Sequence, residues 1–206
     1  MRILKIFLLL FSCGLLAQNV EMTPSEKDAF QHKVLEKAGK LESLSADFAQ
    51  NRSMEMMDGE AESKGKIYFM APNQLKWEYH QPYNYQLLFI DSKLFIADGT
   101  HFQEVDMSSN KIFEKMGDMI SGSMNGKILS AEKDFAVTYY NKEKPVAKLI
   151  PKNKKLSEMV KEIWISFDAS HLITNVKLID SSGDFTEIAL KNIKLNQPIA
   201  DSVFKH

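Results

Sequence analysis

The stretch from Gly65 to Asp91, GKIYFMAPNQLKWEYHQPYNYQLLFID, decides the fold class. Its 27 residues include seven aromatic side chains and two prolines. Apolar and polar residues alternate in three short runs, and the turn-forming segments Ala71-Pro72-Asn73 and Gln81-Pro82 separate these runs. A period of two is the pattern of a β-strand that buries one face. Strands joined by such short turns are antiparallel, because a parallel return needs a long crossover.

The same alternation recurs along most of the chain. Turn chemistry such as Asp98-Gly99 and Ser182-Gly183 separates the runs. The alternating residues are Leu44, Ala46, Phe48, Ile67, Phe69, Leu75, Trp77, Tyr79, Leu87, Phe89, Leu94, Ile96, Phe135, Val137, Tyr139, Val146, Lys148, Ile150, Ile163, Ile165, Phe167, Phe185, Ile188 and Leu190, with Ile173, Val176 and Leu178 less regular. We therefore predict a mainly β chain of the α+β class, with about ten antiparallel strands in one strongly twisted or curled sheet.

Two segments have helical periodicity instead. Thr23-Pro24-Ser25-Glu26 combines a threonine cap, a proline in the first turn and a glutamate three residues after the cap, so we expect a helix of about four turns here. A shorter amphipathic helix is expected within residues 110–126. An apolar sheet face needs a second layer, and two short helices are too small to fill it. This imbalance leaves the apolar concave face of the curled sheet incompletely filled, which favours a ligand-binding surface.

The N-terminus predicts export. Arg2 and Lys5 precede an apolar run that ends at Leu16, which is the layout of a secretory signal peptide and too short for a spanning helix. We expect residues 1–17 to be removed after Ala17, leaving one domain of residues 18–206 in the periplasm. Cys13, the only cysteine, is then discarded with the signal; in the alternative interpretation it is lipidated and anchors the protein to a membrane.

Charge and motif content point away from several classes of function. Loss of Arg2 and Lys5 takes the formal charge from −1 to −3, which argues against a nucleic-acid partner. Seven lysines lie between Lys142 and Lys161, as a solvated hairpin edge or as a docking patch for an acidic partner or anionic headgroups. The five histidines have no metal-ligand spacing, and no nucleophile elbow or phosphate-binding glycine loop occurs. We expect neither an enzyme nor a bound metal or cofactor.

The order of three segments carries a family resemblance. SLSADFAQ (residues 43–50) is followed by GKIYFMAPNQLKWEY (residues 65–79) and then by QPYNYQLLFIDSKLFIAD (residues 81–98). This order, with residues 162–204 as closing strands, resembles the LolA family of outer-membrane lipoprotein carriers over about Leu41 to Phe204. The resemblance implies an unclosed antiparallel half-barrel that holds the acyl chains of a lipoprotein under a helical lid.

The resemblance also implies partners and a site. The partners are acylated lipoproteins, an inner-membrane ABC transporter that releases them and an outer-membrane acceptor, and we expect a monomer. The methionine-rich composition suits an adaptable apolar surface. The implied acyl-chain cavity is lined by Phe48, Ile67, Phe69, Leu75, Trp77, Tyr79, Leu87, Phe89, Leu94 and Ile96, with a lid formed by Phe113, Met116, Met119 and Ile120.

One departure from the family keeps other interpretations open. Members of the family commonly have an arginine directly before the first proline, where this chain has Ala71. Arg52 is the only arginine after the signal peptide, and the sequence does not tell whether it takes over that role. A carrier of another lipid or of a pigment precursor therefore remains an alternative. A membrane-anchored acceptor of the LolB kind is a further one, if Cys13 is acylated.

Overall fold

The computed structural model describes residues 20–54, 59–91, 93–99, 101–107, 129, 133–141 and 143–205. Within them lie twelve strands of one sheet, and every pair is antiparallel. The strands are β1 (Val20–Glu21), β2 (Ser43–Ser53), β3 (Glu60–Met70), β4 (Gln74–Gln81), β5 (Tyr85–Ile90), β6 (Lys93–Asp98), β7 (His101–Asp106), β8 (Phe135–Asn141), β9 (Val146–Pro151), β10 (Val160–Phe167), β11 (Ile173–Asp180) and β12 (Phe185–Leu195). The helices are α1 (Pro24–Gly39), α3 (Lys154–Ser157) and the 3-10 turn η2 (Asp201–Phe204).

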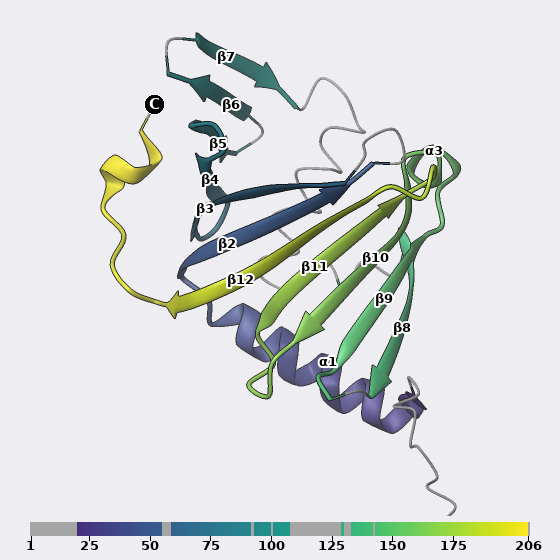
Figure 1. The fold of residues 1–206 in the computed structure, drawn as a ribbon. Helices are drawn as coiled ribbons and strands as arrows, with labels where there is room; N and C mark the ends of the chain where they lie inside the picture. Colours follow the sequence, from purple (N-terminus) through teal and green to yellow (C-terminus); the bar gives the residue numbers. More distant parts are fainter. Residues whose placement is uncertain are drawn as a thin grey trace, which may run out of the picture.

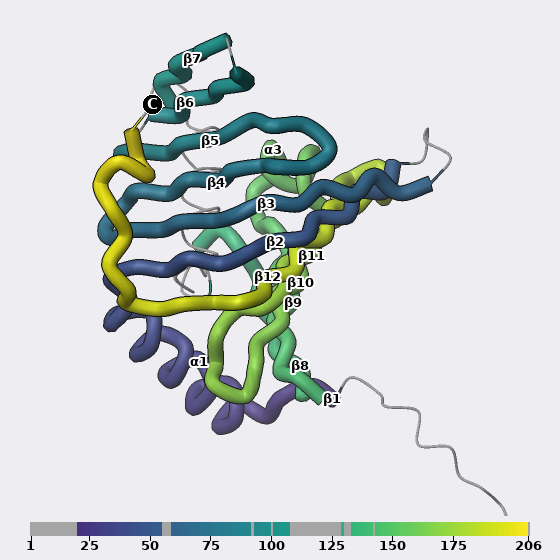
Figure 2. The backbone as a smooth tube through the Cα atoms, turned by 60° about the vertical axis from the view of Figure 1, so that its left-hand side comes forward, coloured from purple at the N-terminus to yellow at the C-terminus, as the bar shows by residue number. Residues whose placement is uncertain are grey.

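Two meanders make up the sheet. Strands β2 to β7 follow one another in space, as do β8 to β12, and the pairing of β12 with β2 joins the two sets. The sheet curls along its length without closing, with β1 and β7 as its edges (Figures 1 and 2). The predicted unclosed antiparallel half-barrel is confirmed, with twelve described strands where about ten were expected. The strands do not follow one another in chain order throughout, because β1 pairs with β8 at one edge and the last strand, β12, pairs with β2 near the centre.

Helix α1 begins as the sequence predicts. The Thr23 hydroxyl accepts a hydrogen bond from the Glu26 amide, and the Glu26 carboxylate accepts one from the Thr23 amide at 2.8 Å. The hydrogen bonds that the Glu26 carboxylate accepts from the Thr23 amide and the Thr23 hydroxyl lower the pKa of Glu26. The helix runs for 16 residues across one end of strands β8 to β12 (Figure 1). Since Phe30 and Val34 are its buried residues, α1 turns a narrow apolar stripe toward the sheet.

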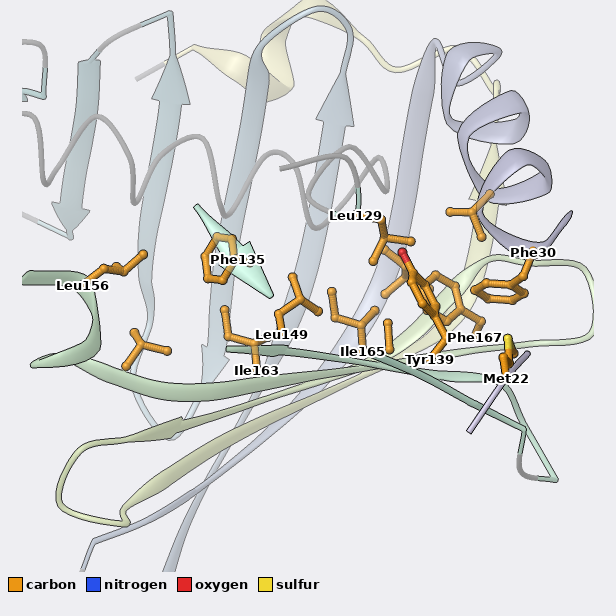
Figure 3. Close-up of a cluster of buried hydrophobic side chains, with 14 residues drawn as sticks. Met22, Phe30, Leu129, Phe135, Tyr139, Leu149, Leu156, Ile163, Ile165 and Phe167 are labelled. Atoms are coloured by element: carbon orange, nitrogen blue, oxygen red, sulfur yellow. The ribbon is translucent and has the colours of Figure 1, made fainter. Parts of the chain in front are cut away.

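That stripe completes the first of two inner cores, here named the helix-covered core (Figure 3). The Phe30 ring meets Phe167 edge-on at 5.1 Å between centroids and Tyr139 at 5.7 Å. Such edge-to-face pairs are favourable beyond the area they bury. The buried members of this core are Met22, Phe30, Val34, Leu129, Phe135, Tyr139, Ala147, Leu149, Leu156, Val160, Ile163, Ile165, Phe167 and Ile173.

Two details of this half differ from the simple alternation in the sequence. The inward side chains of β9 are Ala147 and Leu149, both fully buried, whereas Ile150 is 44% exposed on the outer face. In β11 the uneven spacing after Ile173 has a local cause. Phe167 is opposite Ile173 while Ser166 is opposite Asn175, so the strand carries a bulge at this point.

The outer face of the β3–β6 region is covered by the segment that follows β12. Phe204 of η2 is 5% exposed and packs with Leu88 and Phe95, with Ile199 and Val203 at the margin of the cluster. In Figure 2 this segment runs across the ends of β2 to β5. Strand β5 is therefore buried on both faces, with Leu88 on one side and Phe89 on the other.

The predicted helix within residues 110–126, the lid residues and the proposed signal peptide lie outside the described residues. Within the described ranges no helix is both long and apolar enough to cross a membrane.

Candidate ligand-binding face

The inner face of β2 to β6 carries the second inner core, here named the ladder core. Its buried members are Leu44, Ala46, Phe48, Ile67, Phe69, Leu75, Trp77, Tyr79, Phe89, Met107 and Leu190. Cross-strand register aligns these side chains in rows, because residues directly opposite each other in antiparallel strands point to the same face.

Two rows are apolar from β2 to β6. In the first, Leu44 is opposite Phe69, Phe69 opposite Leu75, Leu75 opposite Phe89, and Phe89 opposite Leu94. In the second, the same pairings join Ala46, Ile67, Trp77, Leu87 and Ile96. Both rows run perpendicular to the strands, so together they form a continuous apolar surface.

A third row depends on Gly65. Its neighbours across the strands are Phe48 and Tyr79. A Cβ at Gly65 would lie 1.9 Å from the Glu78 carbonyl oxygen and 2.8 Å from the Phe48 ring. The glycine thus lets the Phe48 ring approach the backbone, where it meets Trp77 and Tyr79 edge-on at 5.5 and 5.0 Å.

Polar groups enter this third row. The Tyr79 hydroxyl donates to the Gln50 side-chain oxygen at 3.0 Å, and the Tyr79 ring stacks on Tyr85 at 4.1 Å between centroids. Burial, together with the neighbouring Tyr85, raises the pKa of Tyr79. The hydroxyl therefore stays protonated and available as a donor, so the inner face changes along the strands from hydrocarbon at Leu75 to hydrogen-bonding groups at Tyr79.

Trp77 lies between these two environments. Its side chain is 7% exposed, in the row between Ile67 and Leu87. The indole Nε1 is buried, and among the described residues no acceptor lies within hydrogen-bonding distance of it. A buried donor without a partner is uncommon in native proteins and costs roughly 1–3 kcal/mol.

A pocket of about 190 Å³ adjoins the ladder core where α1 meets the sheet. Its walls are mainly apolar and come from both inner cores, with Val34 and Ile173 on one side and Leu44 and Leu195 on the other. Lys37 and Lys40 belong to its lining, and each ammonium group already has a partner: the Ser170 carbonyl and the Glu36 carboxylate, both at 2.7 Å.

The structure brings most of the expected cavity residues together. The members of the ladder core among them are Phe48, Ile67, Phe69, Leu75, Trp77, Tyr79 and Phe89, with Leu87 and Leu94 half-buried against it. Ile96 is half-buried and lies opposite Leu87, but it is not packed into the cluster. Their role as an acyl-chain cavity stays a prediction.

Sequence reasoning missed Leu190 and Met107 as members of this surface. Leu190 lies opposite Phe48, and its strand follows Phe48 by more than 130 residues, so no local pattern indicates the pairing. Met107 lies just beyond the end of β7, where alternation no longer applies.

Arg52 does not occupy the place of the family arginine. Position 71 follows the end of β3 at Met70, which pairs with Ser43 at the start of β2. Arg52 pairs with Ala61, at the other end of the same two strands. It shares the inner face of β2 with Phe48 and Gln50 by alternation, and it is exposed.

The described side chains include no group of three or more histidine, cysteine, aspartate or glutamate residues that could hold a metal ion. The described fold belongs to one class of architecture, the open antiparallel half-barrel, with a helix across one end and an apolar inner face.

Comparison with known proteins places the chain in a family of this architecture. The family model for the outer membrane lipoprotein carrier protein LolA matches residues 39–206. The chain therefore belongs to the LolA family, as its sequence resemblance predicts. Members of this family are lipoprotein carriers rather than enzymes.

Relatives of known name agree. The chain is 24% identical over 172 residues to the outer-membrane lipoprotein carrier protein of Francisella tularensis (strain SCHU S4 / Schu 4), which covers 84% of this chain and 80% of that protein. It is 23% identical over 167 residues to the protein of the same name from Methylococcus capsulatus, with 79% and 76% covered.

Among solved structures, a chain of the Pseudomonas aeruginosa MucA/MucB complex matches with a TM-score of 0.50 at 10% identity. The match covers 86% of this chain and 60% of that chain, so the present protein spans less than two thirds of that neighbour. At this identity the likeness concerns the fold alone.

Proposed function

We propose that this protein is a periplasmic chaperone that binds the acyl chains of lipoproteins and shuttles them from the inner to the outer membrane. The observation that carries the proposal is the inner face of β2 to β6, where two cross-strand rows present apolar side chains without interruption. Acyl chains gain about 0.8 kcal/mol for each CH₂ that they bury, so such a face holds them without a covalent bond. Membership of the LolA family supports this choice of cargo.

Release follows from the same physics. Binding by apolar contact has no strongly directional component, so a partner with a better-packed surface can take the chains over. On this proposal an inner-membrane ABC transporter loads the protein and an outer-membrane acceptor unloads it. The mature chain begins at Gln18 and acts as a monomer of one domain, without a nucleic-acid partner.

The proposal assigns the inner-face residues to the acyl-chain cavity. They are Phe48, Ile67, Phe69, Leu75, Trp77, Tyr79, Leu87, Phe89, Leu94 and Ile96, with Phe113, Met116, Met119 and Ile120 as the lid. The pocket of about 190 Å³ beside Leu44 and Leu195 offers further apolar wall at the end of this face.

Native mass spectrometry tests the proposal on the full chain, purified without detergent from the periplasm of its own host. We expect a mass increment that matches a triacylated lipoprotein. The matched control is a Leu87→Asp variant, in which a carboxylate replaces a half-buried leucine of the inner face and should abolish the increment. Protein that carries no acylated species even when co-expressed with a transporter of the lipoprotein-releasing kind would contradict the proposal.

A second candidate is a carrier of another lipid or of a pigment precursor, and Ala71 is the observation that favours it. The family arginine is missing there, and Arg52 lies at the opposite end of the β2–β3 pair. A small lipid or polyene adduct in the same spectrum would select this candidate. Sequencing of the mature N-terminus addresses a membrane-anchored acceptor, because a free Gln18 excludes an acylated Cys13.

A further inference from the structure

The indole N–H of Trp77 is a feature of the inner face that hydrocarbon binding does not explain. Trp77 is only 7% exposed, and its Nε1 has no hydrogen-bond partner among the described residues. A phenylalanine would supply the same kind of ring for apolar contact without a buried donor. The donor therefore points to a ligand atom that accepts a hydrogen bond.

The other tryptophan shows the contrast within the same chain. The indole Nε1 of Trp164, on the outer face of β10, donates to the Glu162 carboxylate at 2.9 Å. Its ring also stacks on Tyr140 and lies beneath the ammonium group of Lys148, 4.9 Å from the ring centroid. The indole N–H of Trp164 thus has a partner within its own sheet, whereas that of Trp77 has none among the residues that the structure describes.

The described neighbours of Trp77 provide no hydrogen-bond acceptor for its indole N–H. Its direct cross-strand partners, Ile67 and Leu87, are aliphatic. The nearest hydroxyl along β4 belongs to Tyr79, and that group is itself a donor to Gln50. The described environment of Nε1 therefore consists of hydrocarbon and of groups already engaged.

We propose that Trp77 is a specificity residue that donates a hydrogen bond to the ester or amide carbonyl at the head of a bound acyl chain. The hydrocarbon of the same chain packs on Ile67, Leu75 and Leu87. This inference rests on the proposed carrier function and refines it. An indole can only donate and an acyl carbonyl can only accept, so the two groups match. A carbonyl that pairs inside an apolar site also avoids the cost of burying it unpaired.

The recognition distinguishes acylated molecules from plain hydrocarbon. An ether-linked or free alkyl chain fills the same apolar surface but leaves the indole unpaired. An ester-linked or amide-linked chain satisfies it. The inner face would then select for acyl chains, in addition to binding hydrophobic ligands in general.

The test compares two synthetic lipopeptides with the same peptide and chain length, one with two palmitoyl esters and one with two hexadecyl ethers. The chain has two tryptophans, so a ¹⁵N spectrum of the full protein contains two indole N–H signals. We expect the Trp77 signal to move downfield with the ester lipopeptide and much less with the ether, while the Trp164 signal stays in place. This readout needs no variant and does not depend on the folding of one.

Affinities complete the test. Trp77→Phe should weaken ester binding roughly 3- to 10-fold, the range expected for one hydrogen bond, and leave ether binding nearly unchanged. Trp164→Phe, the matched control, should change neither affinity. Equal weakening for both lipopeptides, or a Trp77 signal that ignores the bound ester, would overturn the inference and leave the carrier function standing. If neither lipopeptide binds the unaltered protein, the carrier function itself fails and the inference fails with it.

Discussion

The two halves of the inner face contain similar apolar residues but differ in how helix α1 packs on them. In the helix-covered core, Phe30 and Val34 of α1 pack onto β8 to β11 with edge-to-face aromatic contacts. In the ladder core, helix α1 contributes no buried residue, and the indole donor of Trp77 has no partner among the described residues. One half has the features of a core that stabilises the fold, and the other has those of a binding face.

Hydrophobicity alone does not separate the two roles. Both halves bury aromatic and aliphatic side chains to below a tenth of their surface. What separates them among the described residues is the covering helix, because α1 buries Phe30 and Val34 in one core and no residue in the other. Substitutions that affect stability and ligand binding in different proportions test this division between the two halves.

The largest effect is expected at Gly65 in the ladder core. A Gly65→Ala substitution puts a methyl group 1.9 Å from the Glu78 carbonyl oxygen, and that backbone cannot move without disrupting the β3–β4 pairing. We expect the free energy of unfolding to fall by about 4 kcal/mol or more, measured by urea denaturation. Gly39→Ala is the control, since nothing lies within 4 Å of its added methyl group at the end of α1. A Gly65→Ala protein of unaltered stability would contradict the prediction.

Next in size is the loss of the aromatic centre of the helix-covered core. Phe30→Ala should lower the free energy of unfolding by about 3–5 kcal/mol, because the ring is 6% exposed and contacts two other rings. Binding of an acyl probe by the folded fraction should hardly change. Phe102→Ala is the control, because its ring is 51% exposed. If Phe30→Ala reduced probe affinity as much as stability, the division between the two halves would be wrong.

Adjacent leucines of β5 sharpen the comparison within one strand. Leu88 is 1% exposed on the outer face and packs with Phe204, so Leu88→Ala should cost about 2–4 kcal/mol of stability with little effect on probe binding. Leu87 is half-buried on the inner face, and Leu87→Ala should cost only about 1 kcal/mol. Calorimetric titration with an ester lipopeptide should show roughly 5-fold weaker binding for Leu87→Ala. The reverse assignment of the two effects would show that the ligand binds the outer face.

The smallest effect concerns the turn that fastens α1 to the sheet. The Asp168 carboxylate accepts hydrogen bonds from the Ser170 amide, the Ser170 hydroxyl and the Leu172 amide at 2.8 to 2.9 Å. Partial burial by itself raises the pKa of Asp168, but these bonds outweigh burial and the net shift is downward. The same turn accepts the Lys37 ammonium group at the Ser170 carbonyl and places His171 against Phe30.

Since the folded pKa of Asp168 is depressed, its contribution is complete above the unfolded value of about 3.9 and is lost as the pH falls through the folded pKa. Asp168→Asn should therefore cost about 1 kcal/mol at pH 7 and progressively less below pH 4. Urea denaturation at both pH values measures this difference. A cost that stays constant down to pH 3 would show that the carboxylate charge is not involved.

Much of the fold could be predicted from local patterns. The capping box at Thr23 sets the start of α1, and turns such as Ser182-Gly183 end strands where they were expected. The alternation at Ile67, Leu75 and Leu87 also indicates which side chains share a face. Alternation works there because one face of each strand is more deeply buried than the other.

The rest depends on contacts between distant segments. No local signal shows that β12 pairs with β2, or that the segment around Phe204 covers the outer face at Leu88. The apolar run of β5 therefore does not reveal from sequence that the strand is buried on its outer face as well as on its inner face. In β9 the visible period was that of Val146, Lys148 and Ile150, while the inward residues are Ala147 and Leu149. The unpaired donor of Trp77 is likewise a property of its surroundings and not of its residue type.

The pairing of β12 with β2 has a consequence for how the chain comes together in time. Asn196 fixes this joint: its side-chain oxygen accepts from the Glu42 and Ser43 amides and its side-chain nitrogen donates to the Lys40 carbonyl, across as many as 156 residues of sequence. At synthesis rates of about 5–20 residues per second, β12 follows β2 off the ribosome by roughly 7 to 28 seconds. Throughout that interval one edge of β2 has no partner strand, and the sheet cannot be completed. A nascent chain of this design stays open until its last strand arrives.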